Sequence, residues 1–321
     1  MLNCCNRFLL VIALLCAGLC ISPSPVRAEG VRVELSEEKT VTVPADWGHP
    51  AGHRAVIRTL SLSNKDITYQ FTYKVCVSAE QHGGKDCVPF GEDCGLGMTK
   101  PSYANWFGGG MLSGIPIGAD NIANRKASFN ISEQGERDGA QITWACTDSK
   151  VTLDVMMLPD SSYLYLKLST IPAIPLKQAT LTCFPCSFAR TRAITTADAV
   201  VQNKSGEWVN KLFKAGTLPV YWWVYYADST ADFAKDPKSS GPCSLVVLPQ
   251  DLNVVNIANG YAVSTVLIIK GTTVRFAINE MPKTSNEDGL AEIRAGAAKT
   301  ADNLLLLFPD TRNDGAEAPG K

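Results

Sequence analysis

Residues 67–77 read Ile-Thr-Tyr-Gln-Phe-Thr-Tyr-Lys-Val-Cys-Val, with apolar or aromatic side chains at every second position and mostly polar ones between them. Successive side chains of a β-strand point to opposite faces, so this period of two predicts a strand with one buried and one wetter face. Residues 162–169 alternate in the same way. The dominant local structure of the chain is therefore predicted to be the β-strand.

Comparable runs recur along the rest of the chain. They predict further strands at 31–35, 40–43, 55–62, 141–146, 151–158, 179–184, 220–226, 244–248, 261–269 and 273–279. One long stretch has helical spacing, with apolar side chains from Leu290 to Phe308; we expect Asn286 to cap this helix and Pro309 to end it. The chain is predicted to be all-β: a large antiparallel β-sandwich, supersandwich-like, with one C-terminal helix.

The first 28 residues have the order of a secretory signal peptide. Arg7 supplies a positive charge, residues 8–20 are apolar, and Val26 and Ala28 are small residues three and one before a cut. We therefore expect cleavage after Ala28 and a secreted or periplasmic protein, with an uncleaved membrane anchor as the alternative. One β-sandwich domain is expected over 29–309, and a disordered tail over 310–321.

The composition excludes several classes of partner. Without residues 1–28 the chain has 28 basic and 31 acidic residues, and this net charge of −3 does not favour nucleic acid or an anionic membrane surface. Hydrophobic residues at 45% and charged residues at 19% suit a globular protein with a sizeable core. After the signal, no apolar run reaches the roughly 18 residues that span a bilayer. No nucleic-acid partner and no membrane span are expected.

Seven of the 11 cysteines lie beyond residue 28, and in an oxidising compartment some of them should form disulfide bonds. They are Cys76, Cys87, Cys94, Cys146, Cys183, Cys186 and Cys243. A bridge between Cys87 and Cys94, or from Cys76, fits the Gly-rich turn that they flank. Cys146 and Cys243 lie in apolar strand patterns and are expected to be buried thiols.

Neither a metal nor a cofactor is predicted. The spacing of Cys183 and Cys186 occurs in redox dithiols and in half of a zinc site, but here it follows a strand and no second pair completes four ligands. A structural disulfide or ordinary thiols are the alternatives. The histidines are His49, His53 and His82, so a histidine-based triad cannot draw its histidine from the later strands.

The densest aromatic stretch is Tyr-Trp-Trp-Val-Tyr-Tyr at 221–226. On a strand, Tyr221, Trp223 and Tyr225 share one face, and such rings can stack on sugars while their polar tips form hydrogen bonds. The Gly-rich segment 91–120, which holds Tyr103 and Trp106, interrupts the strand pattern and could line the same surface. These five residues are the candidate ligand-binding residues. The alternatives are an aromatic strand packed between layers and an ordered crossover over 91–120.

The acidic residues after this strand and elsewhere in the chain suggest no catalytic pair. They include Asp154, Asp160, Asp228, Asp232, Asp236 and Glu280. Glycoside hydrolysis needs two carboxyl groups about 5–9.5 Å apart, and the sequence assigns that geometry to no two of them. The catalytic residues of any enzymatic function stay unknown at this level.

Three stretches carry a family resemblance. They are Leu-Pro-Asp-Ser-Ser-Tyr-Leu-Tyr-Leu-Lys-Leu at 158–168, Leu-Thr-Cys-Phe-Pro at 181–185 and Gly-Pro-Cys-Ser-Leu-Val-Val-Leu-Pro at 241–249. They resemble secreted bacterial β-supersandwich proteins of the galactose-mutarotase-like type. The resemblance implies that fold and a carbohydrate ligand bound across a concave sheet. Mutarotases of the family use histidines with a glutamate base, and this chain has no histidine after residue 82. Fold alone does not establish function.

We therefore expect a secreted carbohydrate-binding or carbohydrate-associated β-sandwich protein that does not catalyse a reaction. One alternative is a carbohydrate-active enzyme, either a glycosidase or a polysaccharide lyase. The other is a structural or interaction protein of the cell envelope, with all of its aromatic side chains in the core. The expected partner is a carbohydrate ligand, and no cofactor is expected.

Overall fold

The computed structural model describes most of the chain. The described residues are 30–43, 53–76, 95–101, 115–117, 120–122, 127–134, 137–172, 174–183, 191–196, 200–202, 211–228, 232–239, 241–259 and 263–310. The expected signal peptide and residues 311–321 of the expected tail lie outside these ranges. So do Tyr103, Trp106, Cys87, Cys94 and Cys186.

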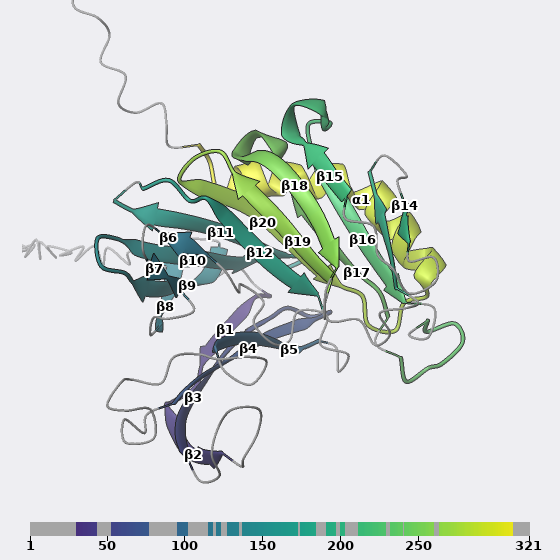
Figure 1. Ribbon diagram of the computed structural model, residues 1–321. Helices are drawn as coiled ribbons and strands as arrows, with labels where there is room; N and C mark the ends of the chain where they lie inside the picture. Colours follow the sequence, from purple (N-terminus) through teal and green to yellow (C-terminus); the bar gives the residue numbers. More distant parts are fainter. Residues whose placement is uncertain are drawn as a thin grey trace, which may run out of the picture.

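A nine-stranded antiparallel sheet lies at the centre of the fold (Figure 1). In spatial order its strands are β14(Val200–Gln202), β13(Thr191–Thr195), β16(Trp222–Asp228), β17(Cys243–Val247), β20(Thr273–Glu280), β11(Leu164–Ile171), β10(Lys150–Met157), β9(Arg137–Ala145) and β8(Ala127–Gln134). Strands from distant parts of the sequence are neighbours here: β20 pairs with both β11 and β17.

Two smaller sheets pack against one face of the nine-stranded sheet. The N-terminal sheet consists of β1(Arg32–Leu35), β3(His53–Ser63), β4(Thr68–Cys76) and β5(Gly95–Lys100), with β2(Lys39–Val43) paired to β3. The four-stranded sheet consists of β12(Gln178–Cys183), β19(Val263–Ile269), β18(Leu252–Asn259) and β15(Lys211–Lys214). The short elements are β6(Pro116–Ile117), β7(Asp120–Asn121) and the 3-10 helices η3(Ala215–Thr217) and η4(Pro249–Asp251).

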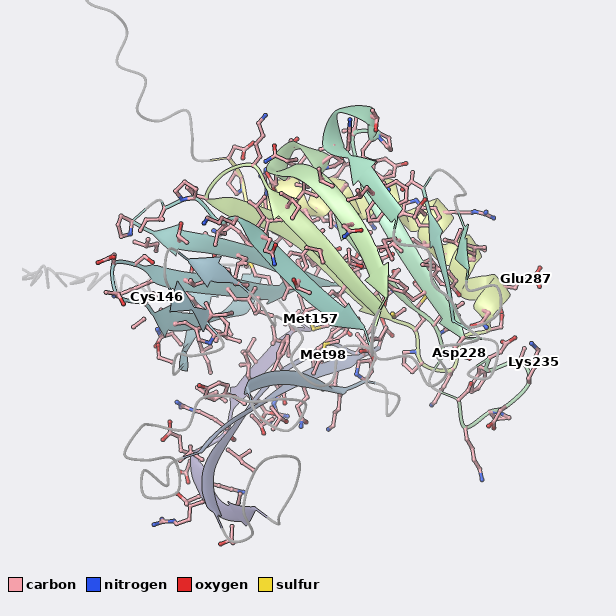
Figure 2. All side chains as sticks on the ribbon, in the orientation of Figure 1. Met98, Cys146, Met157, Asp228, Lys235 and Glu287 are labelled. Carbon is pink, nitrogen blue, oxygen red and sulfur yellow. The ribbon has the colours of Figure 1, made fainter. Side chains whose placement is uncertain are left out.

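One large apolar core fills the space between these sheets. In β10 every odd residue from Val151 to Met157 points into it, and β11 contributes Leu164, Leu166 and Leu168. Met98 of β5 and Met157 of β10 both belong to this core, and Figure 2 labels them where the N-terminal sheet meets the central one. The period of two seen in the sequence therefore places one side-chain set of each strand in this core.

Helix α1(Asn286–Leu307) covers part of the other face of the nine-stranded sheet, opposite the four-stranded sheet (Figure 1). Its buried stripe consists of Gly289, Ile293, Ala297, Thr300, Ala301, Leu304 and Leu307. The prediction that Asn286 caps the helix is wrong. Ser285 is the N-cap, because its hydroxyl accepts a hydrogen bond from the amide of Asp288, whereas the side chain of Asn286 donates to the carbonyl oxygen of Asp228.

Further contacts tie the start of α1 to the loop that follows β16. A carboxylate oxygen of Asp232 accepts hydrogen bonds from the amides of Ala234 and Asn286, and Lys235 forms an ion pair with its other oxygen. Figure 2 labels Asp228, Lys235 and Glu287 at this end of the helix. Although burial opposes ionisation, the two amides and Lys235 hold the pKa of Asp232 below its ordinary value. The helix is therefore anchored at its first turn.

The prediction of an all-β sandwich with a C-terminal helix is confirmed. Two local predictions need revision. Residues 95–100 of the Gly-rich segment form β5, which pairs with β4. Strands β8, β13, β14, β15 and β18 and the short β6 and β7 went unpredicted. Cys243 is a fully buried thiol as expected, whereas the Cys146 thiol is only partly buried. Within the described ranges, no helix combines the length and hydropathy needed to cross a bilayer.

Candidate functional site

The aromatic strand β16 is buried on both faces. Trp222 and Tyr226 point into the core between the sheets, while Trp223 and Tyr225 lie beneath α1, with 4% and 0% of their surface exposed. The tyrosine hydroxyl of Tyr225 donates a 2.7 Å hydrogen bond to the carbonyl oxygen of Asn286 in the helix. Core packing, the alternative considered for this strand, therefore holds for Trp223 and Tyr225, and the expectation that their rings face outward is wrong.

The remaining predicted residues add no aromatic binding surface to the described structure. Tyr221 is half-buried at the start of β16 and packs against the same cluster as Trp223. Tyr103 and Trp106 lie outside the described residues. A second aromatic strip, Tyr163 and Tyr165 before and in β11, is also covered by α1. These rings are buried because α1 packs over them. The alternation in the strands was interpreted correctly, but it does not show what covers each face of the sheet.

Where α1 ends, the same face of the nine-stranded sheet becomes polar. The alternation of each strand places one row of five side chains across β8, β9, β10, β11 and β20. The row consists of Asn130, Gln141, Asp154, Lys167 and Arg275, each directly opposite the next in the strand register. A second row lies beside it and carries only hydroxyl groups: Ser128, Thr143, Thr152, Ser169 and Thr273. We call these ten residues the polar face.

Hydrogen bonds hold the first row in a defined arrangement. The side-chain amide of Gln141 donates to one oxygen of Asp154 at 2.7 Å, and the ammonium group of Lys167 lies 2.8 Å from the other oxygen. Asp154 and Lys167 keep 21% and 31% of their side-chain surface exposed, so a ligand can reach both. In the second row, the hydroxyl groups of Thr152 and Ser169 lie 2.8 Å apart and share a hydrogen bond.

Arg275 closes the row next to the end of the helix. Its guanidinium group is almost fully buried, and it contacts Asp251 with two hydrogen bonds of 2.8 and 2.9 Å. It also donates to the carbonyl oxygen of Phe308 and forms an ion pair with Asp310. Burial would lower the pKa of Arg275, but the two carboxylates outweigh it and raise this pKa. Arg275 therefore locks the C-terminal end of α1 to the sheet.

This arrangement suits recognition of a ligand with many hydroxyl groups. The polar face combines amide, carboxylate, ammonium and hydroxyl groups, which act as donors and acceptors at fixed positions on paired strands. Its charges are matched: the carboxylate of Asp154 pairs with Lys167, and Arg275 pairs with Asp251 of η4. Among the described residues, no group of three or more His, Cys, Asp or Glu side chains could hold a metal ion.

Sequence reasoning missed the polar face. The sequence pattern showed Asp154 only as one acid among several. Gln141 lies 13 residues before Asp154, which in turn lies 13 residues before Lys167. Only the strand register places the three side by side. The available signal was the set of polar alternate positions in adjacent antiparallel strands, which the hairpin connections of β9, β10 and β11 would have aligned.

No protein-family model matches the sequence, and neither does any curated protein. Three solved structures show a distant likeness of scaffold. An α-N-acetylgalactosaminidase, NagBb from Bifidobacterium bifidum (quadruple mutant), has a TM-score of 0.44 and 10% identity, over 77% of this chain and 38% of that one. A proposed aldose 1-epimerase from Klebsiella pneumoniae has a TM-score of 0.40 and 9% identity, over 84% and 96%.

The third is a TPR-domain containing protein from Parabacteroides distasonis, with a TM-score of 0.37 and 12% identity, over 80% of this chain and 56% of that one. The chain thus spans 38% of the length of NagBb. These likenesses are too distant to support a function. The fold and the polar face define an all-β sandwich with an ordered polar sheet surface.

Proposed function

We propose that the protein binds carbohydrate on the polar face and does not catalyse a reaction. The observation that supports this most is the pair of parallel rows, one of charged and amide groups and one of hydroxyl groups, across five adjacent strands. Sugars present several hydroxyl groups at once, and each hydroxyl can both donate and accept. A surface that offers both kinds of partner at fixed positions suits such a ligand.

The dimensions of the polar face favour a short oligosaccharide over a single sugar. Arg275, at the β20 end of the first row, is only 2% exposed, so the accessible side chains of that row lie on β8, β9, β10 and β11. Adjacent strands lie about 4.8 Å apart, and these three steps span about 14 Å. A ligand lying along the row would meet a new side chain at each of these strands. Because β9, β10 and β11 are paired on both sides, their side chains are held in place before the ligand arrives, which lowers the entropic cost of binding.

Charge pairing favours a neutral ligand and argues against catalysis. Both oxygens of Asp154 already interact, one with Gln141 and one with Lys167. Asp251 and Asp310 are engaged by Arg275. Hydrolysis of a glycosidic bond requires one carboxyl group that donates a proton and a second that acts as nucleophile or base. Carboxylates whose oxygens are already bound by cations are poorly placed to serve as this pair.

Export belongs to the same proposal. It rests on the N-terminal pattern of Arg7, the apolar residues 8–20 and the small residues before position 29. Expression of the full chain followed by fractionation and N-terminal sequencing tests it. A mature chain that starts at Glu29 outside the cytoplasm is the expected result, and full-length protein retained in the cytoplasm would contradict it.

Glycan binding can be tested on an array of neutral and anionic oligosaccharides, followed by calorimetry of the hits. Asp154→Asn removes the charge that holds Lys167, and Gln141→Ala removes one donor and one acceptor. Each lost hydrogen bond should weaken binding roughly 3- to 100-fold, with charged pairs at the upper end. Lys65→Ala, at a side chain with 74% exposure outside the polar face, is the matched control and should bind normally.

Both variants should retain the circular dichroism spectrum of the parent protein, because Gln141 and Asp154 are only partly buried. Failure of every neutral glycan to bind would reject the proposed function. If both variants bind glycan as tightly as the parent protein, the ligand does not bind on the polar face.

A further inference from the structure

Two buried hydroxyl groups lie unpartnered beneath the first half of α1. Tyr163 is 6% exposed and Ser244 is fully buried, and neither hydroxyl oxygen has a hydrogen-bond partner within the described structure. Asn279 lies between them: it is directly opposite Ser244 in the register of β17 and β20, while Tyr163 precedes Leu164, the partner of Ile278. These three side chains form a polar row across the sheet, separate from the polar face.

The helix contributes polar groups and space above this row. The side-chain amide of Asn279 donates to Glu292 at 3.0 Å, and the hydroxyl of Thr300 donates to the carbonyl oxygen of Gly296 at 3.1 Å. Gly296 lies one turn from both Glu292 and Thr300. Gly296 is half-exposed and has no side chain, so no side chain from this position fills the space next to these groups.

The hydroxyl of Tyr163 lies near the side chains of Ser244, Thr300 and Asn279, but none of them meets the geometry of a hydrogen bond that would satisfy it. Burial raises the pKa of Tyr163 to about 12, and nearby Ser244, Thr300 and Asn279 counteract part of that rise. The phenol is therefore protonated at neutral pH and retains a hydrogen to donate. A buried polar group without a partner is costly, and native proteins usually satisfy such groups with protein atoms or with ordered water.

We propose that one ordered water molecule occupies this gap between the nine-stranded sheet and α1, bridging the hydroxyl groups of Tyr163 and Ser244. Buried waters typically make about three hydrogen bonds, and Asn279 or Thr300 supplies the third partner. Water fits better than a cation, because Glu292 is the only charged side chain among these groups. Its carboxylate already accepts from Asn279 and is exposed to solvent.

The sign of a stability change tests the proposal. With a bridging water, Ser244→Ala and Tyr163→Phe each remove a partner and should shift the unfolding equilibrium roughly 5- to 10-fold toward the unfolded state. The double variant should lose less than the product of the two single effects, because both act through one water. In a dry site, Ser244→Ala would only remove an unsatisfied hydroxyl, and stability would stay equal or rise.

Thr195→Val is the matched control. The Thr195 hydroxyl is also fully buried and unpartnered, but it lies on β13, away from this row. The residue opposite Thr195 in the register is Val224, which offers no second hydroxyl for a water to bridge. This variant should therefore be as stable as the parent or more stable. A high-resolution crystal structure of the parent protein provides a second measurement that does not depend on the variants folding. Density within hydrogen-bond distance of both hydroxyl groups supports the water; an empty gap, or a cation there, overturns it.

Discussion

Two glycines of α1 provide a paired test of how the helix sits on the sheet. Gly289 and Gly296 are seven residues apart, both inside the helix, and Gly289 is buried against the sheet. In an unobstructed helix interior, replacing glycine by alanine stabilises a protein by about 1 kcal/mol, because alanine loses less backbone entropy. The same substitution at the two positions should nevertheless have opposite effects here.

At Gly289 the added methyl group has no room. Its Cβ would lie 2.7 Å from Cγ of Pro242, 2.8 Å from the hydroxyl oxygen of Tyr225 and 3.0 Å from Sδ of Met281. Tyr225 cannot yield without breaking its hydrogen bond to the carbonyl oxygen of Asn286. Overpacking costs about 1–3 kcal/mol and the lost hydrogen bond about 0.5–1.5 kcal/mol. After the propensity gain of about 1 kcal/mol, Gly289→Ala should destabilise by about 0.5–3.5 kcal/mol.

At Gly296 the Cβ meets no other atom within 4 Å. Gly296→Ala should therefore raise the free energy of unfolding by up to about 1 kcal/mol. Urea unfolding of both variants, followed by circular dichroism, measures the two values under identical conditions. If Gly289→Ala proves as stable as the parent protein, α1 does not rest on Tyr225 as described, and the burial of the aromatic strand loses its explanation.

Three further predictions concern the anchors of α1. Arg275→Met leaves the buried carboxylate of Asp251 without its partner and should lower the free energy of unfolding in urea by about 3–5 kcal/mol. Replacing both Arg275 and Asp251 by leucine should cost much less. Equal losses in the single and double variants would contradict the buried ion pair. Trp223→Ala should lower the free energy of unfolding by about 3–5 kcal/mol, because it leaves a cavity beneath the helix. A variant that loses glycan binding but keeps the stability of the parent would contradict the burial of Trp223. Because the pKa of Asp232 is lowered in the folded protein, its charged form stabilises the fold fully when the pH is above the ordinary pKa of 3.8, and this contribution disappears as the pH falls through the lowered pKa. The difference in the free energy of unfolding between the parent and Asp232→Asn, measured from pH 7 to pH 2, should therefore shrink only in that acidic range.

Much of the architecture was accessible from local patterns. The alternation over 67–77 and 162–169 corresponds to β4 and β11, and the spacing from Leu290 to Phe308 corresponds to α1. The strands that escaped prediction have weaker patterns. β8 reads Ala-Ser-Phe-Asn-Ile-Ser-Glu-Gln, and its alternation of apolar and polar residues is short, because it ends at Ser132. Such a strand is stabilised mainly by its pairing with β9, which the sequence of β8 alone does not reveal.

The candidate site was much less accessible. Aromatic residues were a reasonable guide to a sugar surface, yet Trp223 and Tyr225 serve to seat α1 on the sheet. Gln141, Asp154 and Lys167 form the ordered polar row instead, although no short motif connects them. The sequence does not distinguish an aromatic ring that is buried from a carboxylate that is exposed to solvent. Which of them reaches solvent depends on where a helix from the far end of that chain packs.

Local order alone determined that this protein is built of strands with one terminal helix, because side-chain periodicity depends only on the dihedral angles of neighbouring residues. Only the tertiary structure decided which half of the central sheet is covered and which half stays polar. That choice depends on the register of β20 between β11 and β17 and on the anchoring of α1 by Asp232 and Arg275. These contacts join residues that are far apart in sequence, and their free energy exists only once the chain has folded.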